Sequence, residues 1–275
     1  MNLRNLFAFG TGIGIELGEQ SLEIVVAQVR PWGITVSGKT VIADFRTRPV
    51  AEWSAEFHAF VKRAGAGHLS ATVLLPRNET IVRQIALPGV AAKDIEAALS
   101  FQLDSLHPYG EDEVLWGWRK LGNGQVLIGL MRREALERYV EMFAEAGIPL
   151  AAFTFSASAA HAAARMIEGP PAEGFVAVIR SSGGPLEIYG EGPGRPLFSA
   201  EFELPPERAV ALAAAELRLP PDAAQVPPEK ILPVPRVNPV ENDLSRDALP
   251  YAAALAGACP WLAASANLLP AEHRK

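Results

Sequence analysis

Cysteine is almost missing from this chain, since Cys259 is the only one in 275 residues. One thiol cannot form a disulfide within the chain, and it leaves no Cys-x-x-Cys pair and no four-ligand zinc spacing, which fits a reducing compartment. The five histidines show no His-x-x-x-His or His-Glu pairing that would indicate a metal site. We therefore expect neither a disulfide nor a bound metal.

Positive charge is also in short supply: 25 Lys and Arg stand against 31 Asp and Glu, for a net charge of −6. No basic face is evident, so nucleic acid is not an expected partner. The N-terminus lacks the long apolar run and cleavage site of a secretory signal. Residues 248–270 are uncharged, but Pro260 would break a spanning helix in its middle, and we expect a buried helix followed by a loop.

Hydrophobic residues are plentiful at 49%, with 20% charged, so we expect a well-buried core in one large domain or two lobes. The N-terminal part predicts three strands, a helix and a short buried strand, at 13–18, 22–29, 33–43, 51–64 and 70–76. This β-β-β-α-β order predicts a mixed sheet.

A different pattern occupies about residues 78–148. Gly122-Asn123-Gly124 is a strong hairpin turn, and Gly147 is a typical helix stop. The predicted elements are a strand, a helix, two strands and a helix, at 80–87, 91–106, 113–121, 125–131 and 133–146. We expect this β-α-β-β-α module to be inserted into the larger sheet.

The pattern of the first half then repeats. A strand, an alanine-rich helix, a three-strand meander and a further helix are predicted at 150–157, 157–167, 175–204 and 206–217. A proline-rich region with one candidate strand, "EKILPV", leads to a closing helix at 247–258. Two β-β-β-α halves indicate an internal duplication. We divide the chain into a first lobe (1–155), a second lobe (156–266) and a C-terminal segment (267–275).

The duplicated β-β-β-α core with a module inserted in its first half resembles the actin-like (ribonuclease H-like) α/β fold, and the place of the insert resembles the branch that includes FtsA. The segments "IGIELGEQSLEIVVAQV", "PRNETIVRQIALPG" and "FQLDSLHPYGEDEVLWGWRKL" are similar to PilM of type IV pilus platforms and to GspL of type II secretion. This resemblance implies a non-enzymatic scaffold at the cytoplasmic face of the inner membrane, linking an assembly ATPase to a PilN- or GspM-like membrane protein. It also allows a homodimer.

The C-terminal "NLLPAEHRK" resembles the Asn-Leu-Leu-Pro segment that begins PilN, the membrane protein docked by PilM. PilM-like proteins receive that peptide in a groove beside the inserted module. We therefore expect Asn267, Leu268, Leu269 and Pro270 to lie in such a groove, in this molecule or in a neighbour. A chain of this kind would be the cytoplasmic part of a PilM–PilN fusion or of a GspL-like protein, followed by a membrane helix.

The first phosphate turn of the family usually reads "GIDIGSSS", and the matching residues here read "GIELGEQS". Gly14, Gly18 and Ser21 are kept, whereas Glu16 replaces the expected Asp and Glu19 replaces a small residue. Two unit charges about 4 Å apart interact by about 4 kcal/mol at an effective dielectric constant near 20, so a carboxylate facing a triphosphate without a metal would weaken binding.

The second phosphate turn falls within "VIRSSGG", residues 178–184, where Arg180 stands in place of the expected acid. A cation there could contact phosphate but could not hold Mg²⁺. We therefore expect no catalytic residue and no required cofactor, with Gly14, Glu16, Gly18 and Ser21 as a degenerate phosphate turn at which weak ATP binding stays open. The alternatives are an active actin-like ATPase with Mg-ATP between the lobes and, ranked last, a sugar-kinase-like enzyme.

Trp116 and Trp118 alternate along one strand and so share a face. They either pack in the core against helices 91–106 and 133–146 or, together with Arg119, form an aromatic surface for a partner, because aromatic residues and arginine concentrate binding energy at interfaces. The glycines of "GTGIG", Gly10, Gly12 and Gly14, lack the strand and helix of a dinucleotide loop, and we expect a flexible lead-in there.

Overall fold

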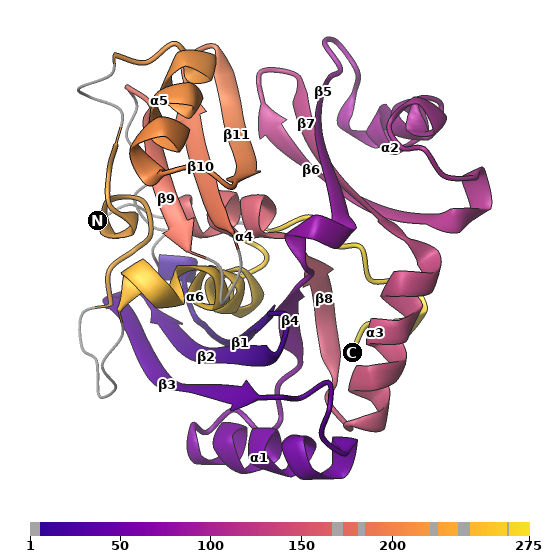
Figure 1. The fold of residues 1–275 in the computed structure, drawn as a ribbon, viewed down its shortest axis with the longest axis vertical. Coiled ribbons are helices and arrows are strands. Elements are labelled where there is room, and N and C mark those ends of the chain that lie inside the picture. The colour runs from indigo at the N-terminus through magenta and orange to yellow at the C-terminus, as the bar shows by residue number, and fades with distance from the viewer. Residues whose placement is uncertain (1–5, 167–172, 181–184, 221–224, 236–242, 263) are drawn as a thin grey trace.

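The computed structural model describes residues 6–166, 173–180, 185–220, 225–235, 243–262 and 264–275. Three sheets are present in these residues, and Figure 1 shows each in its own part of the molecule, with β1 to β4 and β8 low in the view, β9 to β11 at upper left and β5 to β7 at upper right. A five-stranded sheet forms the first lobe, a three-stranded sheet forms the second lobe, and a second three-stranded sheet belongs to the insert.

The first sheet has the strand order β3-β2-β1-β4-β8. Its strands are β1 (Gly10–Leu17), β2 (Ser21–Arg30), β3 (Gly33–Ala43), β4 (Ala71–Leu74) and β8 (Leu150–Thr154). The first three strands form an antiparallel meander, whereas β4 and β8 run parallel to β1. The predicted mixed sheet is therefore present, and β3 and β8 are its two edges.

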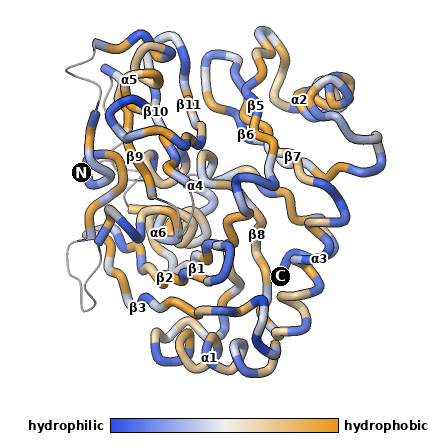
Figure 2. Tube along the Cα trace, in the orientation of Figure 1, coloured by the Kyte–Doolittle hydropathy of each residue, from blue (hydrophilic) through white to orange (hydrophobic). Residues whose placement is uncertain are grey.

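Helices cover both faces of this sheet (Figure 1). Helix α1 (Val50–Arg63) packs against β3 through a buried stripe of Trp53, Phe57, Phe60 and Val61, the face predicted from its period. Helix α6 (Leu244–Ala258) lies on the other face, across β1, β2 and β4. Figure 2 shows hydrophobic residues concentrated along α6 and the strands below it.

Helix α6 packs directly on the glycines of β1. A Cβ atom at Gly10, Gly12 or Gly14 would lie about 2 Å from the carbonyl oxygen of Ala258, Ala254 or Pro250 respectively. The spacing of the glycines along β1 matches the spacing of these carbonyl groups along α6, because two strand residues span about 6.6 Å and four helix residues span about 6.0 Å. The prediction of a flexible lead-in is therefore wrong, since the glycines belong to β1 and permit this close contact.

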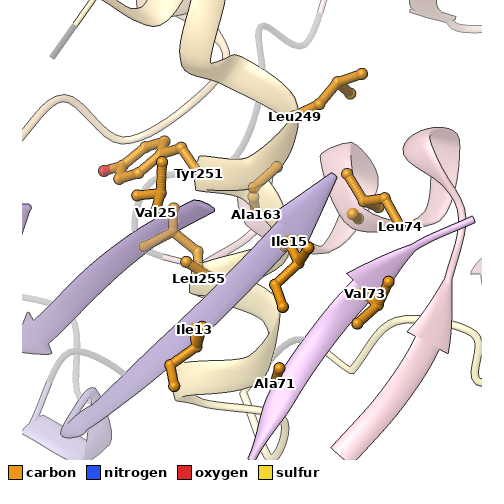
Figure 3. Packing of buried hydrophobic residues seen from close by; sticks show 14 of the residues in the cluster. Ile13, Ile15, Val25, Ala71, Val73, Leu74, Ala163, Leu249, Tyr251 and Leu255 are labelled. Carbon is orange, nitrogen blue, oxygen red and sulfur yellow. The ribbon is translucent and has the colours of Figure 1, made fainter. Parts of the chain in front are cut away.

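Around this contact the core is apolar. Val25 of β2 pairs with Gly14 of β1, and its side chain lies beside Tyr251 and Leu255 of α6 (Figure 3). Helix α6 also contacts the α4 helix (Ser156–Ala164), which is buried along its whole length. No helix of the described residues is both long enough and apolar enough to cross a lipid bilayer.

The insert lies between β4 and β8. It contains β5 (Thr80–Ala86), helix α2 (Ile95–Ser100), β6 (Val114–Gly122), β7 (Gln125–Arg132) and helix α3 (Arg133–Glu145), and the strand order is β5-β7-β6. Asn123 and Gly124 both have positive φ at the turn between β6 and β7, as the predicted hairpin requires.

The single helix predicted over 91–106 is interrupted in the structure. Only Ile95–Ser100 is α-helical, and short 3₁₀ turns flank it at Ala92–Asp94 and Leu103–Ser105. Phe101, between these pieces, is 91% exposed. Ile95, Leu99 and Leu103, which are spaced four residues apart, are buried, as the apolar face of one helix would be. The chain nevertheless bends between Ser100 and Leu103 and follows the surface of the insert's sheet.

The second lobe repeats the meander with β9 (Phe175–Arg180), β10 (Leu186–Gly192) and β11 (Arg195–Phe202), followed by helix α5 (Pro206–Leu217). A parallel bridge between Val176 and Gln225 takes the place that β4 has beside β1 in the first lobe. The strand predicted at "EKILPV" is not formed, and a 3₁₀ turn at Pro228–Lys230 stands there instead.

Candidate functional site

The predicted phosphate turn joins β1 to β2. Glu16 is buried and lies on the same face of β1 as Gly14, toward α6. Gly18 donates its N–H to the Ser21 carbonyl, and Glu19 is exposed. Glu16, Gly18 and Ser21 therefore lie at the end of β1 or just beyond it, whereas Gly14 lies in the middle of β1, beneath the Pro250 carbonyl of α6.

This turn is tied to a neighbouring loop. The Arg46 Nε donates a 2.8 Å hydrogen bond to the Glu19 carbonyl, and the Phe45 N–H donates to the Gln20 carbonyl. Carbonyl oxygens of the turn are thus held by donors from 45–46, which fixes the turn without any bound anion.

Polar groups collect at the carboxyl ends of the parallel strands, the edge at which open α/β sheets bind ligands. Glu16 pairs with Leu74 of β4, which pairs with Thr154 of β8, so the three lie in one row. Thr154 is completely buried, and Ser156 follows it at the start of α4.

Glu187 reaches this edge from the second lobe. Its Oε1 accepts hydrogen bonds from Ser156 Oγ at 2.5 Å and Ser199 Oγ at 3.0 Å. Burial raises the pKa of Glu187, opposed by these hydroxyls and by Arg77. Burial and the charge of Glu187 also raise the pKa of Glu201. Among the side chains that the structure describes here, Glu187 and Glu201 outnumber the Arg77 guanidinium, which disfavours a triphosphate without a metal.

The second predicted phosphate turn cannot be compared with the structure. Residues 181–184 and the Arg180 side chain lie outside the described part of the chain. Among the residues that the structure does describe, no group of three or more His, Cys, Asp or Glu side chains is arranged to hold a metal ion.

A second charged cluster fastens the sheet of the second lobe to the end of α4. The Arg165 guanidinium, just after α4, donates to both Glu191 carboxylate oxygens at 2.8 and 2.6 Å, and Tyr189 donates to the same carboxylate. Burial, with Arg165 and Arg119 as lesser causes, lowers the pKa of His161 to about 3. These contacts join the end of α4 to β10 within the second lobe.

The C-terminal strap, residues 264–275, forms the other candidate site. It runs along the free edge of β8, where the Leu268 N–H donates to the Phe153 carbonyl at 2.8 Å and the Lys275 N–H donates to the Leu150 carbonyl. Leu268 and Leu269 are buried in the main hydrophobic core. The strap thus lies along the β8 edge of the first sheet.

Asn267 is the hub of these contacts. Its Oδ1 accepts hydrogen bonds from the N–H groups of Phe153 and Leu269, and its Nδ2 donates to the Ala151 carbonyl. The strap is held on either side as well, because the Ala266 N–H donates to Ser158 Oγ at 2.7 Å and Arg274 Nε donates to the Leu269 carbonyl.

The insert contacts the strap at Gly117 and the Phe155 ring at Gly129. A Cβ atom at Gly117 of β6 would lie 2.3 Å from the Asn267 carbonyl oxygen, and one at Gly129 of β7 would lie 2.3 Å from the Phe155 ring. Sequence reasoning missed this role of both glycines. An isolated glycine inside a strand is the signal that could have found them, since it often marks a close backbone approach.

The predicted partner residues separate onto two faces of β6. Trp116 and Trp118 are half-buried and pack on the α2 side of the insert's sheet, not against α3. They also line a groove of about 680 Å³ that includes Asn267 and Arg274 of the strap. Arg119 points to the other face, toward Arg165 and His161. The groove therefore joins the tryptophans and the strap but excludes Arg119.

The sequence matches no protein-family model and none of the curated proteins. Solved structures are similar in fold. A "PilM-PilN type IV pilus biogenesis complex" is 18% identical with a TM-score of 0.55, and the match covers 76% of this chain and 66% of that one. The cytoplasmic domain of EpsL, "An Inner Membrane Component Of The Type II Secretion System Of Vibrio Cholerae", is 14% identical with a TM-score of 0.59 over 96% of this chain and 100% of that one.

A third similar structure is a Bacteroides thetaiotaomicron protein with an actin-like ATPase fold, at 11% identity and a TM-score of 0.43. The PilM-PilN and EpsL matches both have a TM-score above 0.5. The predicted α/β class and the resemblance to PilM and GspL-like proteins are confirmed at the level of fold, and the chain has an actin-like fold similar to theirs.

Proposed function

We propose that this protein is a non-enzymatic scaffold of the inner-membrane platform of a type IV pilus or type II secretion system, at its cytoplasmic face. It would link an assembly ATPase to a PilN- or GspM-like membrane partner. The fold likeness to proteins of both machines supports a role in such a system. A similarity in fold does not distinguish a scaffold from an ATPase. The proposal of a scaffold therefore rests on the two candidate sites, which are the strap and the region around Glu187.

The single observation that carries the proposal is the buried strap. Asn267 and Leu268 lie between the edge of β8 and the insert, held by backbone and side-chain hydrogen bonds. A surface that takes an extended Asn-Leu-Leu-Pro segment so closely is suited to peptide docking, because main-chain hydrogen bonds supply affinity and side-chain pockets supply specificity. We infer that this chain fills its own peptide groove.

The contacts around Glu187 also support a scaffold, because protein side chains fill the position at which an ATPase would hold its nucleotide. Glu187, on β10, accepts hydrogen bonds from Ser156 at the start of α4 and from Ser199 on β11. Arg165 and Glu191 form a second bond between the end of α4 and the sheet of the second lobe. An active actin-like ATPase, the alternative function, would instead need Mg-ATP to fit between the lobes beside these carboxylates.

The docking proposal is tested by shortening the chain after Ser265 and adding residues 266–275 as a separate peptide. We expect saturable binding, with an Asn267→Ala peptide at least about tenfold weaker, because each 1.4 kcal/mol lost in binding is a factor of ten. If the shortened chain does not fold alone, coexpression with the wild-type peptide should restore it. A folded shortened chain that ignores the peptide would remove the basis of the proposal.

A further inference from the structure

The groove beside the strap runs along an open strand edge. β6 ends the insert's sheet, and in the described part of the chain its only strand partner is β7. The groove of about 680 Å³ is lined from both faces of this edge, by Trp116 and Trp118 on one side and by strap residues on the other. A strand edge presents unpaired N–H and C=O groups that can pair with another chain.

The open part of this edge is short. A register shift between Lys120 and Gly122 disturbs the ladder at the end of β6, and bulges and lysines commonly protect an edge from pairing. The groove reaches only residues 114–118 of the strand. One extended segment of about five residues would therefore fit, adding a fourth strand to the β5-β7-β6 sheet.

The charge around the groove determines whether a bound segment should be acidic or basic. Residues 78–148 contain eleven Asp and Glu and seven Lys and Arg, so this module holds a net −4 of the chain's −6. Glu96 and Asp112, both exposed in the groove, form no ion pair among the described residues. Of the two arginines in this lining, Arg133 donates to the Asp112 carbonyl and pairs with Glu137 at 3.9 Å, so Arg274, whose Nε donates to the Leu269 carbonyl, is the one lining cation left to offset the two carboxylates.

Unpaired carboxylates beside tryptophan rings favour a cation. An ammonium or guanidinium group gains from a carboxylate partner and from the face of a Trp ring within about 6 Å. A second copy of this chain would bring an equally acidic module to the same edge, and like charges facing each other across a strand pair are unfavourable. The groove therefore fits a basic segment of another polypeptide better than it fits the acidic module of a second copy of this chain.

We propose that residues 114–118 of β6 bind an extended, Lys/Arg-rich segment of another protein as an added strand, with its cations at Glu96 and Asp112 and its side chains against Trp116 and Trp118. The strap stays in place in this complex. The site is thus separate from the strap's groove, and either proposal can fail while the other holds.

The probe is a seven-residue peptide of alternating lysine and valine, compared with its glutamate–valine counterpart on the whole chain. We expect the lysine peptide to bind at least about tenfold more tightly, because complementary charge governs such a contact. Amide exchange should slow in residues 114–118. The variant E96Q/D112N should lose about tenfold in affinity, whereas E141Q/E145Q, an equal change of charge on exposed α3 residues, should lose less than about twofold.

Three results would overturn the inference. The two peptides could bind equally, the two double variants could lose affinity equally, or exchange in 114–118 could stay unchanged while the lysine peptide binds. Slowing of exchange in 114–118 with protein concentration alone, together with dimer formation in sedimentation, would assign the edge to a second copy and would equally refute the basic partner.

Discussion

Gly117 and Gly129 stand opposite each other on β6 and β7, and neither position has room for a Cβ atom. The strap crosses the sheet at Gly117, and the Phe155 ring lies against Gly129. This pair of glycines is therefore the point at which the insert meets both the first lobe and the strap.

Replacing Gly117 tests that contact. A Gly117→Ala methyl would collide with the Asn267 carbonyl, and we expect a loss of about 1–3 kcal/mol in the free energy of unfolding, as for other overpacked sites. Urea unfolding measures the loss, and amide exchange should quicken in 264–275. Gly194→Ala is the matched control, since nothing lies within 4 Å of a Cβ there. Equal behaviour of the two variants would argue against the contact.

Replacing Gly12 tests the packing of α6 on β1. The new methyl would lie 2.0 Å from the Ala254 carbonyl oxygen, which belongs to a helix backbone and cannot rotate away. We expect a larger loss than at Gly117, about 3 kcal/mol or more, because overpacking a rigid core forces backbone shifts. Thermal unfolding reports it as a lower Tm. A Gly12→Ala protein with the wild-type Tm would contradict the described packing.

The sequence predicted most of the fold but not this packing. The meander, the insert and the Gly122-Asn123-Gly124 hairpin follow from alternation and turn residues, which are local signals. The role of Gly12 was missed because glycine is a poor strand former, and its need for space depends on α6, which lies more than 200 residues away in the chain.

The site was predicted only in part, for the same reason. The shared face of Trp116 and Trp118 follows from strand periodicity, which also places Arg119 on the opposite face. That Trp116 packs toward α2, and that Asn267 lies against Gly117, depends on how distant elements meet. Sequence periodicity gives faces, whereas partners across the fold come only from the tertiary structure.

Asn267 anchors the strap through its side-chain amide. Asn267→Ala removes the acceptor used by the Phe153 and Leu269 N–H groups, and an unsatisfied buried donor costs about 1–3 kcal/mol. Asn267→Asp keeps that acceptor and loses only the bond to Ala151, so its effect should be smaller. Urea unfolding ranks the two variants. A ranking in which Asp is as harmful as Ala would mean that the accepted bonds contribute little.

His161 should make the fold sensitive to acid. Its pKa is lowered to about 3 by burial and by the nearby Arg165 and Arg119, so the neutral ring is the folded form. In the unfolded chain this histidine has a pKa of about 6.5. Its full contribution to the free energy of unfolding is therefore present above that pH, and the contribution falls by up to about 1.4 kcal/mol per pH unit as the pH drops toward 3.

Unfolding followed from pH 7 to pH 4 tests this dependence. We expect His161→Leu to lose less stability over that range than the wild type, because leucine carries no proton-binding group. Parallel slopes for wild type and His161→Leu would show that this ring is not responsible.

Isothermal titration of the whole chain with Mg-ATP tests the central claim most directly, namely that this actin-like fold serves docking and not nucleotide hydrolysis. Glu16, Glu187 and Glu201 at the junction between the lobes predict no saturable binding at nucleotide concentrations up to about 1 mM, equivalent to a binding free energy weaker than about −4 kcal/mol. Saturable binding of one Mg-ATP per chain, followed by its hydrolysis, would contradict the account.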